Sequence, residues 1–409
     1  MNWKTVLAIL SCNIVFMSAS YTMLIPFLPM YLTQELGVDA ASVNLWSGIV
    51  FSSTFLVSAI MAPIWGRMAD TKGKRLMAIR ASILLTISYF LGGIVTSPEQ
   101  LTLMRIFQGF AAGLWPMDLA IMTLYAPPEK LGLCLGTMQG VLTGGGVIGP
   151  LLGGILAEFF GMRVSFFLAA AGLLFNSIVF IFFIKEPPNP ADKDTSREES
   201  TPAEKSAASS LLHIPLIRNM LLCGMLVQMV ILILQPIMTT YITKLAGNLP
   251  NLIFVSGLIF SLGGIAGAIT APLWGRFGQH HGFFKTMSLA LVFAGISITI
   301  QGIPENLYWF AGMQFTGGLF FSGIYPSINA ILAANTPARF KGSVFGLFFS
   351  SQQIGSMIGP LLGGAIATFL GMKYVFFTAG IILVILSFTV HHHFMTEPAI
   401  KASTETPMK

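Results

Sequence analysis

Asp118 and Arg105 are ionisable residues within one long apolar stretch of the sequence, 101–125. A charged side chain at the centre of a bilayer costs on the order of 2.5 to 3.5 kcal/mol on insertion scales, so an intramembrane carboxyl group marks a functional position by default. Burial favours the neutral form of a carboxyl group, which permits reversible protonation. We therefore predict that Asp118 binds and releases a proton. The alternative is a carboxylate near the membrane surface, paired with a loop cation or reached by water.

Arg105 and Asp118 do not pair directly if this stretch is one helix. Their separation of 13 residues corresponds to about 20 Å of rise and roughly 220° of rotation. Arg105 also lies close to the start of the stretch. Its guanidinium group therefore has two interpretations, a functional cation or a side chain that extends to the nearby membrane interface.

A glycine-rich segment, "GGVIGPLLGG" at 145–154, has the spacing of a helix-packing motif. Gly145 and Gly149 are four residues apart and share a helix face, so a second helix can approach closely. Pro150 has no N–H and permits a bend. Simple close packing is the alternative to the role that we predict, which is a tight, bendable seam between the two halves of the protein. The residues of this seam are Gly145, Gly149, Pro150, Gly153 and Gly154.

The sequence does not contain the residue patterns of an enzyme at membrane depth. We find no Ser/His/Asp arrangement there, and Cys12, Cys134 and Cys223 form no spaced metal or disulfide framework. We therefore expect no catalytic residues, no metal and no cofactor.

The elements that position these residues are membrane spans. Hydrophobic residues make up 54% of the 409 positions and charged residues only 9%, which is more apolar side chain than one globular core can enclose. A spanning helix satisfies its own backbone hydrogen bonds and needs about 20 residues. The sequence therefore predicts an all-α membrane protein with twelve transmembrane helices. These are 5–33, 44–66, 76–96, 101–125, 132–157, 163–185, 216–241, 252–274, 284–302, 306–332, 342–367 and 373–395.

The distribution of basic residues predicts the topology. With the N-terminus inside, most of the 22 Lys and Arg residues fall on the cytoplasmic side, as the positive-inside rule expects. The net charge of +6 is therefore a topology signal and does not indicate a nucleic-acid-binding surface. We expect a multi-pass protein of the bacterial cytoplasmic (inner) membrane with both termini in the cytoplasm.

The chain repeats itself. "APIWGR" at 62–67 returns as "APLWGR" at an offset of 209, and "GPLLGG" at 149–154 returns unchanged at an offset of 210. Between the copies lies a polar segment rich in Pro, Ser and charge, which cannot bury a core. Parallel repeats of this kind place a substrate site between them near mid-membrane. We predict two pseudo-symmetric six-helix bundles, 1–185 and 216–395, joined by a cytoplasmic linker, 186–215, and followed by a cytoplasmic tail, 396–409.

These features resemble the major facilitator superfamily over essentially all of the spanning region. The segment "GRMADTKGKR" is similar to the superfamily's loop signature at Gly66, Asp70, Gly73, Lys74 and Arg75, although Thr71 stands where a basic residue is usual. The resemblance implies that Asp70 docks near the start of a helix of the other half and helps to hold the outward-facing state, as a helix dipole would favour. A tight glycine turn with positive-inside charge is the alternative. Gln279 replaces Asp70 in the second copy.

Further motifs narrow the resemblance to the twelve-span drug:proton antiporters. "RIFQG", with Arg105 and Gln108, is similar to a motif of proton-coupled members, which implies a role for Arg105 in proton transfer. The segment 145–154 is similar to the antiporter signature, and "LIPFLP", with Pro26, resembles the double-proline element of helix 1. The segment 44–74 is most similar to the MdtG-type bacterial multidrug exporters. The spans of the second half contain no acidic residue, so proton coupling is implied mainly by the resemblance.

The expected activity is secondary active transport and not catalysis. The resemblance implies proton-coupled efflux of lipophilic or amphiphilic drugs by alternating access, and the many Phe and Met residues suit an adaptable binding site. The alternatives are a dedicated exporter or importer of a single metabolite, such as a siderophore or sugar, and, remotely, a membrane enzyme or receptor. Expected partners are a small-molecule substrate, protons and the lipid bilayer, with no nucleic acid, for a monomeric chain. The candidate cavity residues are Pro26, Gln108, Trp115, Pro116, Tyr325 and Pro326.

Overall fold

The computed structural model describes residues 2–127, 130–184, 214–247, 249, 251–303, 305–336 and 341–396. Over these residues the chain is helical and contains no β-strand. The predicted linker, 186–215, and the predicted tail, 396–409, lie almost entirely outside the described residues.

The helices of the first half confirm the predicted spans with two differences, which are interruptions of the first and the fourth. Trp3–Met23 is followed by two short elements, and the span 101–125 is divided at Ala112 and Gly113. The elements are α1 (Trp3–Met23), α2 (Leu28–Met30), η1 (Tyr31–Glu35), α3 (Val43–Lys72), α4 (Lys74–Ile94), α5 (Pro98–Ala111), α6 (Leu114–Tyr125), α7 (Leu131–Phe160) and α8 (Met162–Phe183).

The helices of the second half follow the same order, including a divided fourth span. They are α10 (Pro215–Ala246), α11 (Leu252–His281), α12 (Phe283–Gln301), α13 (Leu307–Phe321), α14 (Ile324–Ala334), α15 (Lys341–Phe369) and α16 (Met372–Thr396). Among the described residues, ten segments are long and apolar enough to cross a membrane by length and composition. The α5–α6 pair and α15 complete the twelve predicted spans, so the all-α membrane fold is confirmed.

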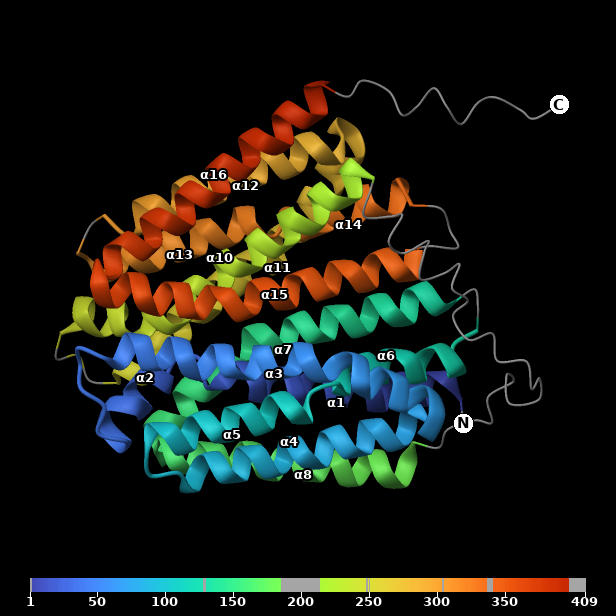
Figure 1. Cartoon of the computed structure of the whole chain (residues 1–409), viewed down its shortest axis with the longest axis horizontal. Coiled ribbons are helices and arrows are strands. Elements are labelled where there is room, and N and C mark those ends of the chain that lie inside the picture. The colour runs from blue at the N-terminus through green and yellow to red at the C-terminus, as the bar shows by residue number, and fades with distance from the viewer. Residues whose placement is uncertain are drawn as a thin grey trace.

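The two ends of the bundle are distinguished by where the chain enters and leaves it. We call the end where α1 begins the terminus side, and the end where α1 finishes the far side. Successive spans alternate in direction, and α16 finishes on the terminus side (Figure 1).

The turns between neighbouring spans depend on single glycines. Gly73 joins α3 to α4 with φ 94°, and Gly161 joins α7 to α8 with φ 85°. Their repeat equivalents Gly282 and Gly371 also have positive φ, at 90° and 112°. With ψ near 140–160°, three of these turns occupy a region of backbone space that is essentially restricted to glycine. The repeat found in the sequence is therefore also a repeat of backbone conformation.

We expect Gly161→Ala to lower the free energy of unfolding by about 1 to 3 kcal/mol, because a side chain strains this backbone region. The space around Gly161 is open, so the cost is conformational and not steric. Thermal unfolding in detergent measures the effect. Gly312→Ala is the matched control, since Gly312 lies inside α13 and an added Cβ there also meets nothing within 4 Å. Equal unfolding temperatures for the two variants would contradict this prediction.

The repeat extends to tertiary contacts within each half. The indole N–H of Trp65 donates to the carbonyl oxygen of Phe110 at 3.0 Å, and Trp274 donates to Leu319 at 2.7 Å. Both residues of the second pair lie 209 positions after those of the first. Buried apolar residues form two clusters, one between Val6 and Ile184 and one between Leu216 and Val390. Each six-helix half thus has its own core.

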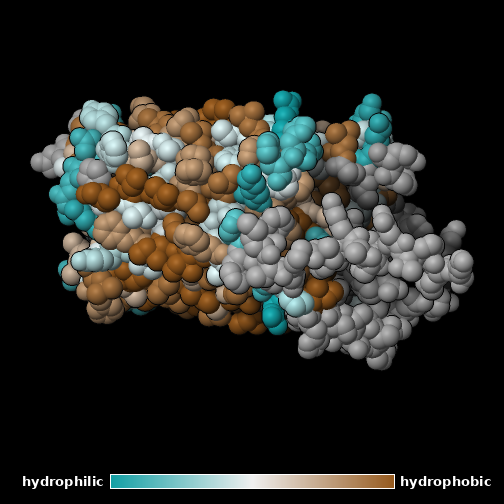
Figure 2. Space-filling view, turned by 90° about the horizontal axis from the view of Figure 1, so that it is seen from above, coloured by the Kyte–Doolittle hydropathy of each residue, from teal (hydrophilic) through white to brown (hydrophobic). Residues whose placement is uncertain are grey.

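The outside of the bundle is apolar between two polar ends. Large apolar side chains such as Leu103, Phe182 and Phe388 are about two-thirds exposed or more, and Figure 2 shows hydrophobic residues covering the side of the molecule. On the far side, Lys373 and Lys244 contact Glu305 at 3.0 and 3.4 Å. Both ammonium groups hold the pKa of the Glu305 carboxyl group below its ordinary value. This surface suits a lipid solvent around the helices and water at the ends.

Candidate functional site

The two halves meet mainly along two helix pairs, α3 with α15 and α7 with α11, and α10 makes smaller contacts with α2 and α3. A Cβ added at Gly257 would overlap the carbonyl oxygen of Pro150, and one added at Gly48 would overlap that of Pro360. Gly154 lies equally close to α11, since an added Cβ would be 3.2 Å from the Cα of Phe254. All these contacts lie in the far-side parts of their helices. We call them the far-side seam.

The glycine-rich segment of α7 is divided between two partners. An added Cβ at Gly145 or Gly149 would collide with Ser18, Ala19 or Thr22 of α1 in the same half, and one at Gly153 would collide with Met23. Only Gly154 among these glycines faces the other half. The expectation that Gly145 and Gly149 contact the other half is therefore wrong. The reason is that α7 is packed on two sides, and four-residue spacing identifies a tight face without identifying its partner.

A cavity of about 320 Å³ lies mainly within the first half and reaches α15 of the second. We call it the N-half cavity. It is lined by apolar, aromatic and uncharged polar side chains, with Phe349 and Gln353 contributed by α15. Gln108, Trp115 and Pro116 line it, so the structure brings together three of the predicted cavity residues.

The break between α5 and α6 shapes this cavity. Gly113 has φ 118°, which ends α5 and starts α6 in a new direction. Arg80 of α4 holds the break, because its guanidinium donates to the carbonyl oxygen of Ala112 at 3.0 Å and stacks on Trp65 with 3.7 Å between the guanidinium carbon and the ring centroid. The break places Trp115, in the first turn of α6, at the cavity wall.

Arg105 is buried beside the same cavity and does not extend to the membrane interface. Its side chain is 2% exposed, and Nη1 donates to Oε1 of Gln108 at 2.8 Å. Its backbone carbonyl accepts a hydrogen bond from Thr54 of α3 at 3.1 Å. Within the described residues, Nε and Nη2 of Arg105 and Nε2 of Gln108 have no hydrogen-bond partner. Several buried donors are thus gathered at this wall.

Asp118 lies in a separate polar cluster in the first half. Nδ2 of Asn13 on α1 donates to Oδ2 of Asp118 at 2.8 Å, and Nδ2 of Asn176 on α8 donates to Oδ1 of Asn13. The three side chains, which we call the Asp118 cluster, are between 0 and 3% exposed. Oδ1 of Asp118 has no partner among the described residues. A neutral carboxylic acid fits this site better than an isolated carboxylate, since a buried charge with one hydrogen bond is costly.

The Asp118 cluster forms a layer directly below the N-half cavity. On each of its three helices, a cavity-lining residue lies one helical turn farther from the terminus side. These residues are Met17 on α1, Leu114 on α6 and Leu173 on α8. The Asp118 side chain therefore does not line the cavity. Any movement of the three helices that line the cavity nevertheless also moves the residues around Asp118.

The second half lacks this polar layer. At the offset of 210, the three positions of the cluster fall on Cys223, Ile328 and Leu386. All three are buried. The same fold is therefore built with apolar side chains at these places, so the polar cluster is not needed for helix packing.

Other predicted residues lie away from the N-half cavity. Pro26 is buried in the turn between α1 and α2. Tyr325 donates to Oε1 of Gln228 at 2.6 Å, and neither Tyr325 nor Pro326 is among the residues lining that cavity.

The predicted loop motif lies on the terminus side. Gly73 makes the turn, and Arg75 donates to the backbone carbonyl oxygens of Ile181 and Ile184 at the end of α8. An arginine is well suited there, because its charge complements the helix C-terminus. The side chain of Asp70 lies outside the described residues, and so does its predicted contact. Gly66 is within α3, and Lys74 begins α4.

Sequence reasoning missed Asn13 and Asn176. Both are single amides in apolar spans, and one amide in a span is weak evidence of a functional residue. Comparison of the two repeats gives stronger evidence, since each amide aligns with an apolar residue of the other half.

Known proteins match the chain along its length. A sequence model described as Major Facilitator Superfamily matches residues 10–267 and 220–408. "Multidrug resistance protein MdtG" of Proteus mirabilis is 33% identical over 383 residues, which is 93% of this chain and 94% of that protein. The protein of the same name from Salmonella paratyphi A is 32% identical over 384 residues, with the same coverage.

Solved transporter structures share the fold. A bacterial homologue of the human lysosomal transporter Spinster, in an inward-facing and occupied conformation, matches with a TM-score of 0.80 and 16% identity over 97% of this chain and 99% of that one. The nucleoside transporter NupG matches with a TM-score of 0.75 and 15% identity over 96% of this chain and 99% of that one.

Proposed function

Because the chain belongs to the major facilitator superfamily and is a multi-pass membrane transporter, we propose that it exports lipophilic or amphiphilic compounds in exchange for protons by alternating access. Its relatives named for multidrug resistance support this substrate class. The observation that carries the proposal is the Asp118 carboxyl group, buried one helical turn below a cavity with an apolar and aromatic lining.

The proposed topology places the terminus side in the cytoplasm of a bacterial inner membrane. The far-side seam then closes the route to the exterior, and this conformation is the one that faces inward. The seam consists of backbone contacts at glycines. The helices can therefore separate without moving large side chains out of buried positions. Alternating access would open the seam and bring the terminus-side parts of α3, α7, α11 and α15 together.

Proton coupling would act through the layer below the cavity. A substrate that enters the N-half cavity presses on Met17, Leu114 and Leu173, and the helices carrying them also carry the Asp118 cluster. Moving them changes the access of water to Asp118, so its proton leaves toward the cytoplasm. A new proton from the exterior would restore the neutral acid. Asp118 thus couples proton and substrate without contact between them, and Arg105 is a second candidate for this role.

The N-half cavity favours bulky apolar substrates over sugars. Trp115, Tyr21 and Phe55 offer aromatic surface, and the described residues that line the cavity carry no charged side chain. A sugar site would need hydrogen-bonding groups on most sides of the ligand, whereas most of the residues lining this cavity are apolar. One chain supplies both walls of the cavity, which supports a monomer as the working unit.

Transport into proteoliposomes with an imposed pH gradient tests this proposal. Ethidium and the neutral dye Nile red serve as probes, with protein reconstituted in defined lipid. We expect uptake against the dye gradient that an uncoupler abolishes. Dye uptake at the same rate with and without the pH gradient would refute proton coupling. Absence of transport for both dyes, alongside proton-driven transport of one sugar or siderophore, would favour a dedicated metabolite transporter.

A further inference from the structure

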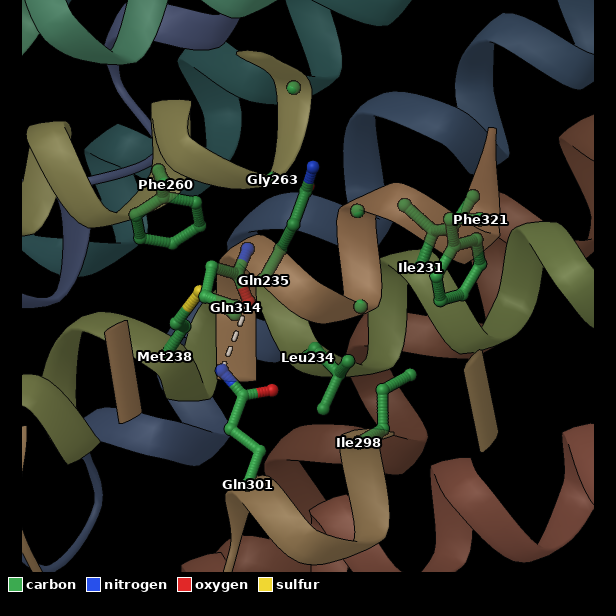
Figure 3. Close-up of a pocket in the computed structure, with 13 residues that line it drawn as sticks. Ile231, Leu234, Gln235, Met238, Phe260, Gly263, Ile298, Gln301, Gln314 and Phe321 are labelled. Carbon is green, nitrogen blue, oxygen red and sulfur yellow. Dashed lines mark hydrogen bonds between the residues drawn. The ribbon is translucent and has the colours of Figure 1, made fainter. Parts of the chain in front are cut away.

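The second half contains a separate cavity of about 270 Å³ between α10, α11, α12 and α13. Figure 3 shows three glutamines, Gln235, Gln301 and Gln314, among apolar and aromatic side chains that include Phe260 and Met238. We call this site the glutamine cavity. The described residues that line it carry no charged side chain.

The glutamine cavity borders the interface between the halves. Gly264 lines it, and an added Cβ at Gly264 would overlap the side chain of Val147 on α7. Next to it, the hydroxyl group of Ser261 donates to the carbonyl oxygen of Val147 at 2.8 Å. Phe260 packs against the cores of both halves. The glutamine cavity therefore lies directly beside the contact between α11 and α7, next to both halves.

Hydrogen bonds orient two of the three amides. Nε2 of Gln301 donates to Oε1 of Gln314 at 3.0 Å and to the carbonyl oxygen of Phe310 at 3.4 Å. Because the carbonyl of Phe310 can only accept, the Gln301 amide group must face it with its NH₂ end. Gln314 then presents its oxygen to Gln301, and its own NH₂ end is directed away from that bond (Figure 3).

The remaining polar atoms of these amides are unpaired. Within the described residues, Oε1 of Gln301, Nε2 of Gln314 and the amide group of Gln235 make no hydrogen bond. The site therefore offers both an acceptor and a donor, whereas the wall near Arg105 offers an excess of donors. A charged ligand group would find no counter-charge in the glutamine cavity, so its desolvation would be uncompensated.

The fold does not require an amide at two of these three positions, 235 and 301. At the repeat offsets, Gln235 and Gln301 correspond to Ile25 and Leu91, both apolar, and Gln314 corresponds to Arg105. Amide side chains in the membrane interior are retained only where they find partners, because an unpaired polar group there is costly. The cavity is small enough to hold one ring-sized portion of a drug-like molecule and too small for all of it.

We propose that the glutamine cavity binds an uncharged amide-like group of the transported molecule, a carbonyl next to an N–H, as found in amides, lactams and imides. Nε2 of Gln314 donates to the ligand carbonyl, and Oε1 of Gln301 accepts from the ligand N–H. The apolar side chains around them hold an attached ring. This assignment rests on the proposed transport of amphiphilic compounds and adds a specificity for one polar group.

Equilibrium binding to purified full-length protein in nanodiscs tests the assignment. The probes are three naphthalenes of similar size: 1-naphthaleneacetamide, methyl 1-naphthaleneacetate and 1-ethylnaphthalene. The amide has both a carbonyl and an N–H, the ester has only the carbonyl, and the hydrocarbon has neither. We expect the wild-type protein to bind the amide about tenfold more tightly than the hydrocarbon, since about 1.4 kcal/mol of hydrogen bonding corresponds to this ratio.

Two variants localise the effect. Gln301→Met and Gln314→Met keep side-chain length and remove the amide group, and Gln279→Met is the control at an exposed position of α11. The wild-type protein should bind the amide more tightly than the ester, because only the amide has an N–H for Gln301. Gln301→Met should bind the amide and the ester equally, and Gln314→Met should weaken amide binding about tenfold. Hydrocarbon binding should stay within about twofold of wild type in both.

Two outcomes overturn the assignment. One is equal affinity of the wild-type protein for all three probes, a comparison that stands even if a variant fails to fold. The other is wild-type amide affinity in both Gln301→Met and Gln314→Met. No ion gradient is present, so absence of proton-driven transport would refute the proposed function and leave this binding result unaffected.

Discussion

Asp118→Asn is expected to fold and to bind substrate but to lose proton-driven transport, down to the level of liposomes without protein. The amide has nearly the shape of the acid and can accept from Asn13 as Asp118 does at 2.8 Å. It cannot gain or lose a proton, so the coupled cycle stops with the site permanently neutral. Dye uptake into proteoliposomes with an imposed pH gradient measures the loss, beside wild type at matched protein content.

A second measurement separates coupling from simple damage. Addition of substrate to detergent-solubilised wild-type protein in weak buffer should release protons, and Asp118→Asn should release none while binding the same dye. Glu158→Gln is the control, because Glu158 is an acid at the far-side end of α7 that lies outside the Asp118 cluster. Gradient-driven uptake by Asp118→Asn at the wild-type rate would remove Asp118 from the mechanism.

The second half supplies a stricter test of whether the polar cluster serves structure or function. Replacing Asn13, Asp118 and Asn176 by the Cys, Ile and Leu of the equivalent positions gives the first half the apolar layer that the second half already uses. Replacing both partners of a buried hydrogen bond by apolar groups of similar shape can be nearly neutral or stabilising. The triple variant should therefore unfold at or above the wild-type temperature and be inactive. Reduced stability with retained transport would show that the cluster is structural.

Much of the fold follows from the sequence because of the repeat. The offsets of 209 and 210 align "APIWGR" with "APLWGR" and "GPLLGG" with itself. In the structure the same offsets relate the two tryptophan contacts of Trp65 and Trp274 and the glycine turns at Gly73 and Gly282. Length and hydropathy locate spans well, since only helices can cross the hydrocarbon with their backbone groups paired.

The partners of each span are not predictable in the same way. Lipid is as apolar as leucine, so a helix face covered by lipid and one covered by another helix have similar compositions. This is why the four-residue spacing of Gly145 and Gly149 identified a tight contact but assigned it to the other half and not to α1. For the same reason the partner of Asp118, 105 residues away at Asn13, was not visible. The break at Gly113 was also missed, although it decides where Trp115 points.

Gly257→Leu is expected to abolish transport by keeping the far-side seam open. In the present conformation an added Cβ at Gly257 would overlap the carbonyl oxygen of Pro150, which belongs to the backbone of α7 and cannot turn aside as a side chain can. The larger side chain of Leu must therefore separate α7 from α11 on the far side. Because the helices are rigid, this separation favours the opposite conformation, in which the terminus-side ends close.

Gly275→Leu is the matched control, since Gly275 lies on the same helix and an added Cβ there meets nothing within 4 Å. Spin labels at Gln100 and Ile303, on the far side of the first and second halves, report the separation in a cysteine-free background. We expect a longer distance in Gly257→Leu than in wild type or Gly275→Leu, together with dye transport at background level. Wild-type transport with an unchanged far-side distance would mean that α7 and α11 tolerate a side chain between them. The seam would then not control access to the cavity, and a different contact between the halves would have to close the far side.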